Sequence, residues 1–176
     1  MSGKTEVIVV GAGASGMVAA IHAAREGASV RILEHKEEAG KKLLMTGNGR
    51  CNLSNERMDP KLYRGTDPSF AENALSQFGV KETLTFFREI GVPVRSRDGY
   101  LYPRNGEARG VRDALLSECE KRKVSIDYEI GIKKIQKEED GFSFFTKQGT
   151  FFSEKCILAT GGCTWKKTGS DGSGFL

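Results

Sequence analysis

Apolar and polar positions in the first part of the chain follow two different periods. The run at 7–10 is entirely apolar and rich in β-branched residues, which predicts a strand buried on both faces. An alanine-rich stretch then continues to Glu26 and is stopped by Gly27, as expected of a helix. The run at 29–33 predicts a second strand, and Glu34 ends it. The chain therefore opens with a strand, a turn, a helix and a second strand.

Beyond Glu34 the pattern is more varied. Residues 35–42 form a polar loop, and residues 53–67 are polar and irregular. Apolar residues at helical spacing predict one helix that ends at Gly91 and another with its apolar face at 111–119. Further strands are predicted at 99–103, 124–128 and 156–159, and a three-stranded meander at 132–137, 142–147 and 150–153.

This order of elements predicts an α/β fold. We expect one domain over residues 1–176, with a helical excursion at 56–123 that leaves the main sheet and returns to it. The meander stands where a simple βαβ protein has a crossover helix. The architecture is therefore Rossmann-like, with a parallel sheet and a three-stranded β-meander as a crossover connection.

Composition narrows the function classes. With 28% charged and 38% apolar residues, the chain has the composition of a soluble globular protein. Its net charge of +4 comes from scattered lysines and arginines, so we expect a solvated surface and no nucleic-acid partner. No apolar run approaches a membrane span, and the N-terminus is too charged for a signal peptide, which predicts a cytoplasmic protein without a membrane partner.

The four cysteines have no spacing typical of a metal site, so no metal is expected and reduced thiols are the default. Cys119 fits the apolar face of a helix, and Cys156 and Cys163 flank a strand end, where structural roles are expected. Cys51 has no second cysteine close in sequence, which argues against the paired thiols of a disulfide reductase.

A glycine-rich turn joins the first strand to the first helix. It consists of Gly11, Ala12, Gly13, Ala14, Ser15 and Gly16. In such a GxGxxG motif the first glycine permits the tight turn, the second lets the backbone approach a pyrophosphate, and the third allows close packing of helix and strand. The helix N-terminus attracts phosphate, and Glu34 can accept hydrogen bonds from a ribose. Strand, turn, helix and acidic residue together predict a dinucleotide-binding unit.

A second unusual stretch follows. It consists of Thr46, Gly47, Asn48, Gly49, Arg50, Cys51 and Asn52. Two glycines bracket an asparagine, so the loop can expose backbone N–H groups, and Arg50 adds one fixed positive charge. By itself the stretch fits a glycine-rich surface turn. Its position shortly after Glu34 favours a continuation of the ligand site.

These motifs resemble the aminoacetone oxidase family of FAD-dependent oxidoreductases, also called BaiN-like. The motifs that carry the resemblance are 7–16 with Glu34, the run 46–55, Tyr102-Pro103-Arg104 and Ala159-Thr160-Gly161-Gly162. The run around Arg50 is specific to this family, and the resemblance covers essentially the whole chain. Trp165 and Lys166 stand where the family usually has Tyr-Pro.

The resemblance implies FAD as cofactor. By that resemblance the glycine turn holds the pyrophosphate and Glu34 holds the adenosine ribose. His35, next in the chain, is a candidate for lining the adenine pocket, and plain solvent exposure is the alternative. Lys42 and the run from Thr46 to Asn52 lie along the pyrophosphate and flavin. Ile132 meets adenine through its backbone. Thr160, Gly161 and Gly162 close over the cofactor.

Family members are about twice as long, so we expect the chain to be the N-terminal part of a flavoprotein, with a fold incomplete at its C-terminus. The complete enzyme is expected to transfer hydride through flavin N5, with NAD(P)H or a small organic substrate as donor. A complementing C-terminal polypeptide is a candidate partner. The alternative is a catalytically silent dinucleotide-binding module. No residue is assigned a catalytic role.

Overall fold

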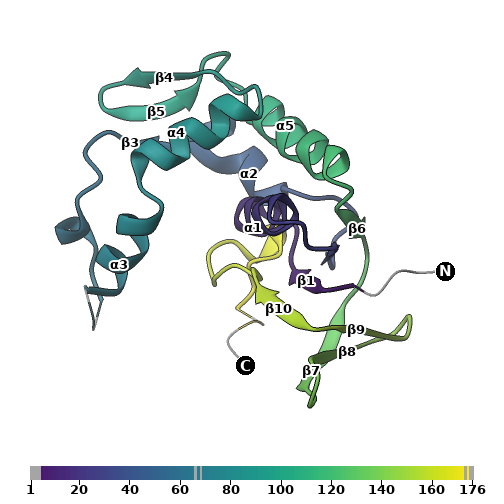
Figure 1. Ribbon diagram of the computed structural model, residues 1–176. Helices are drawn as coiled ribbons and strands as arrows, with labels where there is room; N and C mark the ends of the chain where they lie inside the picture. The colour runs from purple at the N-terminus through teal and green to yellow at the C-terminus, as the bar shows by residue number, and fades with distance from the viewer. Residues whose placement is uncertain (1–4, 66, 68, 173, 175–176) are drawn as a thin grey trace. The chain divides into compact units, whose positions relative to one another are not determined.

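The computed structural model describes residues 5–65, 67, 69–172 and 174. The chain divides into two compact units, residues 1–43 with 115–176 and residues 44–114 (Figure 1). The boundaries fall inside two helices, α2 (Lys41–Met45) and α5 (Ala108–Lys121). The single domain with an excursion over 56–123 stays a prediction.

A parallel sheet forms the centre of the first unit. Its described strands lie in the order β10 (Lys155–Leu158), β1 (Val7–Val10), β2 (Val30–Leu33) and β6 (Ser125–Asp127). Every neighbouring pair is parallel. Parallel strands in this order place their carboxyl ends along one edge, and the glycine turn follows β1 at that edge.

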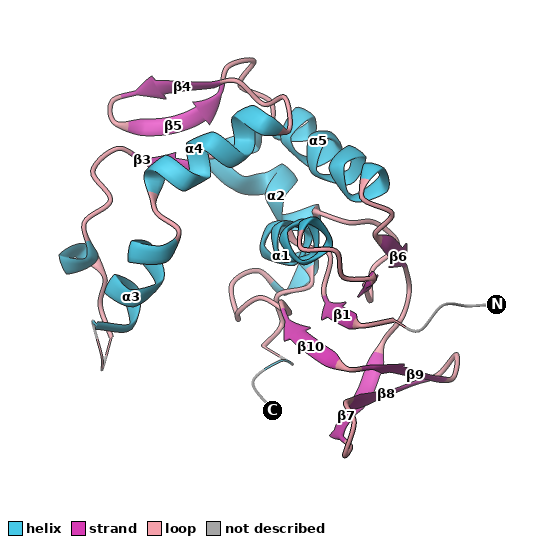
Figure 2. Cartoon of the chain, in the orientation of Figure 1, coloured by secondary structure: helices cyan, strands magenta, loops and turns pink. Residues whose placement is uncertain are grey.

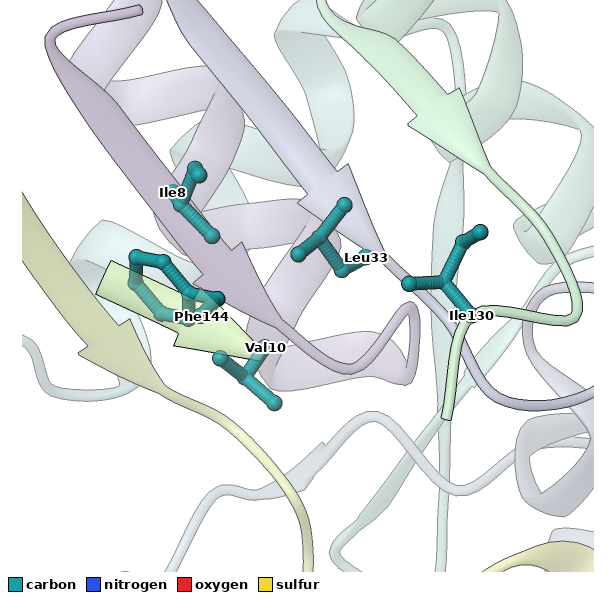
Figure 3. Packing of buried hydrophobic residues seen from close by; sticks show 5 residues of the cluster. All are labelled: Ile8, Val10, Leu33, Ile130 and Phe144. Carbon is teal, nitrogen blue, oxygen red and sulfur yellow. The ribbon is translucent and has the colours of Figure 1, made fainter. Parts of the chain in front are cut away.

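Both faces of this sheet are covered, which explains the unbroken apolar run of β1. Helix α1 (Ala14–Arg25) packs against β1, β2 and β10. Ile8 and Val10, which alternation places on one face of β1, form a core with Leu33, Ile130 and Phe144 (Figure 3). Phe144 belongs to β8 (Phe142–Thr146), the central strand of the antiparallel meander with β7 (Ile132–Lys137) and β9 (Thr150–Ser153). The predicted parallel sheet and three-stranded meander are confirmed.

The second unit is built around a small antiparallel sheet. Its described strands lie in the order β3 (Ser54–Asn55), β5 (Tyr100–Pro103) and β4 (Val94–Arg97), and α4 (Val80–Glu89) packs against β3 and β4 (Figure 2). Asp98 and Gly99 both have positive φ and close the β4–β5 hairpin, which is the turn chemistry that Asp-Gly favours. The unit also contains α3 (Ser69–Gln77) and the 3₁₀ turns η1 (Thr46–Gly49) and η2 (Pro60–Leu62).

Several element boundaries differ from the sequence prediction. The stretch 53–67, expected to be irregular, contains β3 and η2. The predicted polar loop 35–42 ends earlier than expected, because α2 begins at Lys41. Helix α3 was missed although Phe70, Ala74 and Leu75 recur at helical spacing, and none of its residues is buried. The last strand runs one residue earlier than predicted, over Lys155–Leu158. Cys163 was expected to be structural but is exposed.

A buried carboxylate links α1 to α5 within the first unit. Glu118 Oε1 accepts hydrogen bonds from Arg122 Nε at 2.9 Å and from Arg25 Nη2 at 3.5 Å. Glu118 is only 6% exposed. Burial acts to raise the pKa of Glu118, but the Arg122 hydrogen bond and the charges of Lys121, Arg122 and Arg25 outweigh it, so the pKa is lowered. The ionised form is therefore the one that the fold stabilises.

We predict that Glu118→Gln lowers the free energy of unfolding by about 1–3 kcal/mol at pH 7, because hydrogen bonds to a charged group are lost. A lowered folded-state pKa means that this contribution is present above the unfolded pKa and is lost as the pH falls through the folded value. Urea unfolding at pH 7 and at stepwise lower pH measures it. The matched control is Glu120→Gln, an exposed carboxylate on the same helix. A difference between wild type and Glu118→Gln that stays constant into acid contradicts the prediction.

Candidate functional site

The glycine turn holds α1 against the end of β1. Gly11 has φ +103°, and a Cβ there would lie 2.6 Å from the carbonyl oxygen of Ala159. At position 16 a Cβ would collide with the carbonyl oxygen of Gly11 and lie 3.3 Å from Ala159 Cβ. Both glycines are therefore required by close approach of backbone, as the motif predicts.

Gly13 differs from these two glycines. It is the N-cap of α1 with φ −75°, and a Cβ at this position would meet no atom within 4 Å. No side chain caps the helix, and its first turn contains no acidic residue. The first N–H groups of a helix have no intrahelical acceptor, so this end of α1 suits an anion that approaches the backbone closely.

Glu34 points at this turn. Its Oε2 accepts a hydrogen bond of 2.6 Å from the backbone N–H of Ala12, and its Oε1 accepts one of 2.8 Å from the N–H of Lys36. His35 Nδ1 lies 3.1 Å from Oε1. Glu34 is only 6% exposed, so these contacts fix its position, while the remaining lone pairs of a carboxylate can still accept ribose hydroxyls.

Other predicted site residues of the first unit lie next to the turn. Gly40 donates its N–H to the carbonyl of Ala12 at 2.9 Å, which places the start of α2, with Lys42, beside the turn. Thr160 Cα lies 3.6 Å from the position that a Cβ of Gly11 would take. The first unit thus brings Lys42 and Thr160 to the glycine turn.

Ile132 is the first residue of β7, and the residues just before it are hydrogen-bonded to the segment that follows β2. The N–H of Ile130 donates to the carbonyl of Glu34 at 2.8 Å, and the N–H of Glu129 donates to the carbonyl of Lys36 at 3.1 Å. This pairing holds the start of the meander close to Glu34 and His35. The predicted role of the Ile132 backbone toward adenine stays a prediction.

One segment at the site was missed by the sequence analysis. A Cβ at Gly161 would lie 2.7 Å from Ser170 Oγ, and a Cβ at Gly169 would lie 2.8 Å from Cε1 of His35. Residues 169 and 170 therefore connect the end of β10 to the end of β2. Ser170 is buried. Gly169 has φ +95°, a conformation that favours glycine.

The predicted loop from Thr46 to Asn52 lies in the second unit. Its first half forms η1, in which Gly47 and Asn48 both adopt the left-handed conformation. Gly49 and Cys51 also have positive φ. A Cβ at Gly47 would lie 3.1 Å from the N of Asn52 and 3.5 Å from Cε1 of Tyr102. The glycines and the asparagine are therefore needed by a tightly wound loop, because these residue types tolerate positive φ.

Cys51 in this loop is buried, and burial raises the pKa of its thiol, while a hydrogen bond with Thr46 offsets part of the rise. A raised pKa keeps the thiol protonated, which argues against a reactive thiolate. Cys119 lies in the core, and burial, together with the charge of Glu118, raises its pKa to about 11. Within the described part of the chain, no group of three or more His, Cys, Asp and Glu residues is placed to hold a metal ion.

Comparison with known proteins identifies the family. Residues 5–176 match the model of the HI0933-like protein Rossmann domain. The chain belongs to this family. The resemblance seen in the sequence is thereby confirmed, and the fold is that of a Rossmann-like FAD-binding domain.

Two curated relatives in this family have different names. The 3-dehydro-bile acid delta(4,6)-reductase of Clostridium scindens is 48% identical over 169 residues, which are 95% of this chain and 41% of the relative. The ribosomal RNA dihydrouridine synthase of Escherichia coli is 30% identical over 173 residues, which are 98% of this chain and 43% of the relative. The chain thus spans less than half the length of these relatives.

Solved structures with low identity share the fold. The 3-ketosteroid-delta4-(5alpha)-dehydrogenase of Rhodococcus jostii RHA1 has a TM-score of 0.68 at 17% identity, over 90% of this chain and 46% of that one. A thioredoxin reductase of Streptococcus pyogenes has a TM-score of 0.52 at 19% identity, over 92% of this chain and 36% of that one. None of the described helices is long and apolar enough to cross a membrane.

We predict different stability effects for alanine substitutions at Gly16 and Gly13. Gly16→Ala forces a methyl group against the Gly11 carbonyl and costs about 1–3 kcal/mol of unfolding free energy, as overpacking does. Gly13→Ala enters open space at an ordinary φ and leaves the unfolding midpoint in urea nearly unchanged. Equal loss of stability in both variants contradicts this account of the turn.

Proposed function

We propose that this chain is the FAD-binding part of a flavin-dependent reductase that acts on a carbon–carbon double bond of a small organic substrate. The observation that carries the proposal is the Glu34 carboxylate held beside the uncapped N-terminus of α1. Together they offer a hydrogen-bond acceptor for a ribose and N–H groups for a diphosphate, the two parts that FAD and other dinucleotides share.

The residues present suit FAD in three respects. Open space at Gly13 admits a phosphate close to the backbone. Lys42 lies on the helix that begins beside the turn and supplies a positive charge. The meander, whose start is hydrogen-bonded to the end of β2, replaces the crossover helix of simple nucleotide-binding folds. The resemblance to a family of FAD-dependent enzymes implies that this meander favours FAD over NAD.

When bound, FAD supplies two-electron hydride transfer, with NAD(P)H as the expected reductant. The roles of this chain are to bind and orient the cofactor. Glu34 fixes the adenosine end, α1 and Gly13 hold the diphosphate, and residues Thr160 to Gly162 cover it from the end of β10. By the resemblance noted in the sequence, the loop with Arg50 is expected on the flavin side.

Reduction of a double bond is supported by the names of the curated relatives. One is a delta(4,6)-reductase, and the other makes dihydrouridine, which is uridine with two added hydrogens. The relative with 48% identity acts on a small molecule, so we assign a small organic substrate here. The chain spans 41% of that relative, so residues outside this chain are expected to contribute to the substrate site.

The test is the visible spectrum of the purified chain with and without added FAD. Flavin absorption bands that persist after gel filtration support the proposal. A chain that takes up no FAD would instead be a catalytically silent module.

We predict that Gly13→Ala weakens FAD binding by about tenfold or more, because a methyl group at the N-cap keeps the diphosphate from the N–H groups. Quenching of flavin fluorescence during titration measures the dissociation constant. Gly65→Ala is the control, since a Cβ there also enters open space but lies in the second unit. Unaltered affinity in Gly13→Ala argues against a diphosphate at this turn.

Arg50 gives a separate prediction about the flavin side. Arg50→Ala is expected to keep the fold and shift the reduction potential of bound flavin to more negative values, because a positive charge that favours the anionic reduced ring is removed. The expected shift is on the order of tens of millivolts, since about 30 mV corresponds to 1.4 kcal/mol in a two-electron couple. Dye-linked reduction of the FAD-loaded chain measures it, with Arg57→Ala as control. A reduction potential equal to that of wild type would show that Arg50 does not act on the flavin.

A further inference from the structure

The β4–β5 hairpin carries cations and aromatic rings on one face. Arg95 is paired with Tyr102 and Arg97 with Tyr100 across the two antiparallel strands. Residues directly opposite each other, and residues two positions apart on one strand, share a face of a sheet. Arg95, Arg97, Tyr100 and Tyr102 therefore form one surface, the Arg–Tyr face.

The opposite face of the hairpin is the buried one. Leu101 and Pro103 alternate with the tyrosines along β5, and both are buried. Helix α4, whose Phe86 and Phe87 are also buried, packs against β3 and β4 (Figure 2). Hydrophobic contact with α4 thus accounts for one face of the hairpin and leaves the cations and tyrosines on the other.

The Arg–Tyr face is accessible within its unit. Tyr100 is 47% exposed, Arg95 and Arg97 are exposed, and Tyr102 is half-buried beside the loop at Gly47. Asp98 lies 3.8 Å from Arg97, but both side chains are largely exposed. Ion pairs between exposed side chains contribute little to stability, so Arg97 can exchange Asp98 for an anionic ligand.

We propose that the Arg–Tyr face binds single-stranded nucleic acid. The surface contains two pairs, each of one cation and one aromatic ring. The two arginines on β4, and the two tyrosines on β5, are each about 7 Å apart along their strand. Single-stranded nucleic acid repeats an anion and a planar base, and it binds to aromatic side chains on sheets by stacking while cations hold the phosphates. Charge and ring chemistry are therefore complementary at two successive positions.

Two alternatives fit the geometry less well. Small ligands bind in concave sites that enclose most of their surface, whereas exposed side chains on the outer face of a hairpin do not enclose a ligand. Duplexes keep their bases stacked inside, which leaves the tyrosines without a partner. The sequence argued against nucleic acid because its cations are scattered along the chain, but strand pairing brings Arg95 and Arg97 together with two rings.

The test is fluorescence anisotropy with a labelled single-stranded RNA of about 12 nucleotides, within the usual site size of such surfaces. We expect the wild-type chain to bind, and Arg95→Ala/Arg97→Ala to bind about tenfold more weakly at low salt. The double variant should also lower the slope of log K against log salt by about 1.4, since each phosphate contact on a single strand contributes about 0.7. Tyr100→Ala should weaken binding about fivefold or more without changing that slope.

The matched control is Lys137→Ala/Lys147→Ala, which removes two exposed positive charges from the first unit. Equal weakening by this control, equal binding of a duplex of the same sequence, or no binding by the wild type overturns the proposal. Circular dichroism shows whether each variant is folded. The measurement needs no FAD, so its failure is separate from failure of the proposed reductase function.

Discussion

The absence of a side chain at position 16 is the constraint on which the first unit depends. Only a glycine lets α1 approach the Gly11 carbonyl and Ala159 this closely. This contact sets the N-terminus of α1 at the carboxyl end of β1 and ties β10 to the same point. The dipole of α1 and the end of the sheet then meet where an anion would bind. Packing of helix and strand therefore decides the position of the candidate site.

Glu34 is the second element of this arrangement. A buried carboxylate is stable only when its charge is compensated, and here two backbone N–H groups donate to it. Its backbone carbonyl also accepts from Ile130, so one residue links the glycine turn, the end of β2 and the start of the meander. The site is thus held in place by hydrogen bonds that exist before a cofactor arrives, which reduces the ordering that binding must impose.

The second unit provides different chemistry. Its loop at 46–52 is wound through several left-handed residues, and its hairpin has a buried apolar face and a cationic, aromatic one. The proposed dinucleotide site lies in the first unit, and the Arg–Tyr face lies in the second.

The sequence by itself determined the elements that local residue types specify. The run 7–10, the glycine turn, Glu34 and the meander could all be predicted, because local residue types specify them. Helix α3 was missed although its apolar residues recur at helical spacing, and the segment at Gly169 and Ser170 could not be predicted, since its contacts are made with residues distant in sequence. Only the tertiary structure decided that Glu34 hydrogen-bonds to Ala12 and that Arg95 and Arg97 share a face with Tyr100 and Tyr102. Folding brings Glu34 to Ala12 from a distant position in the chain. Pairing of β5 with β4, a strand that the sequence analysis did not predict, brings the four hairpin side chains to one face.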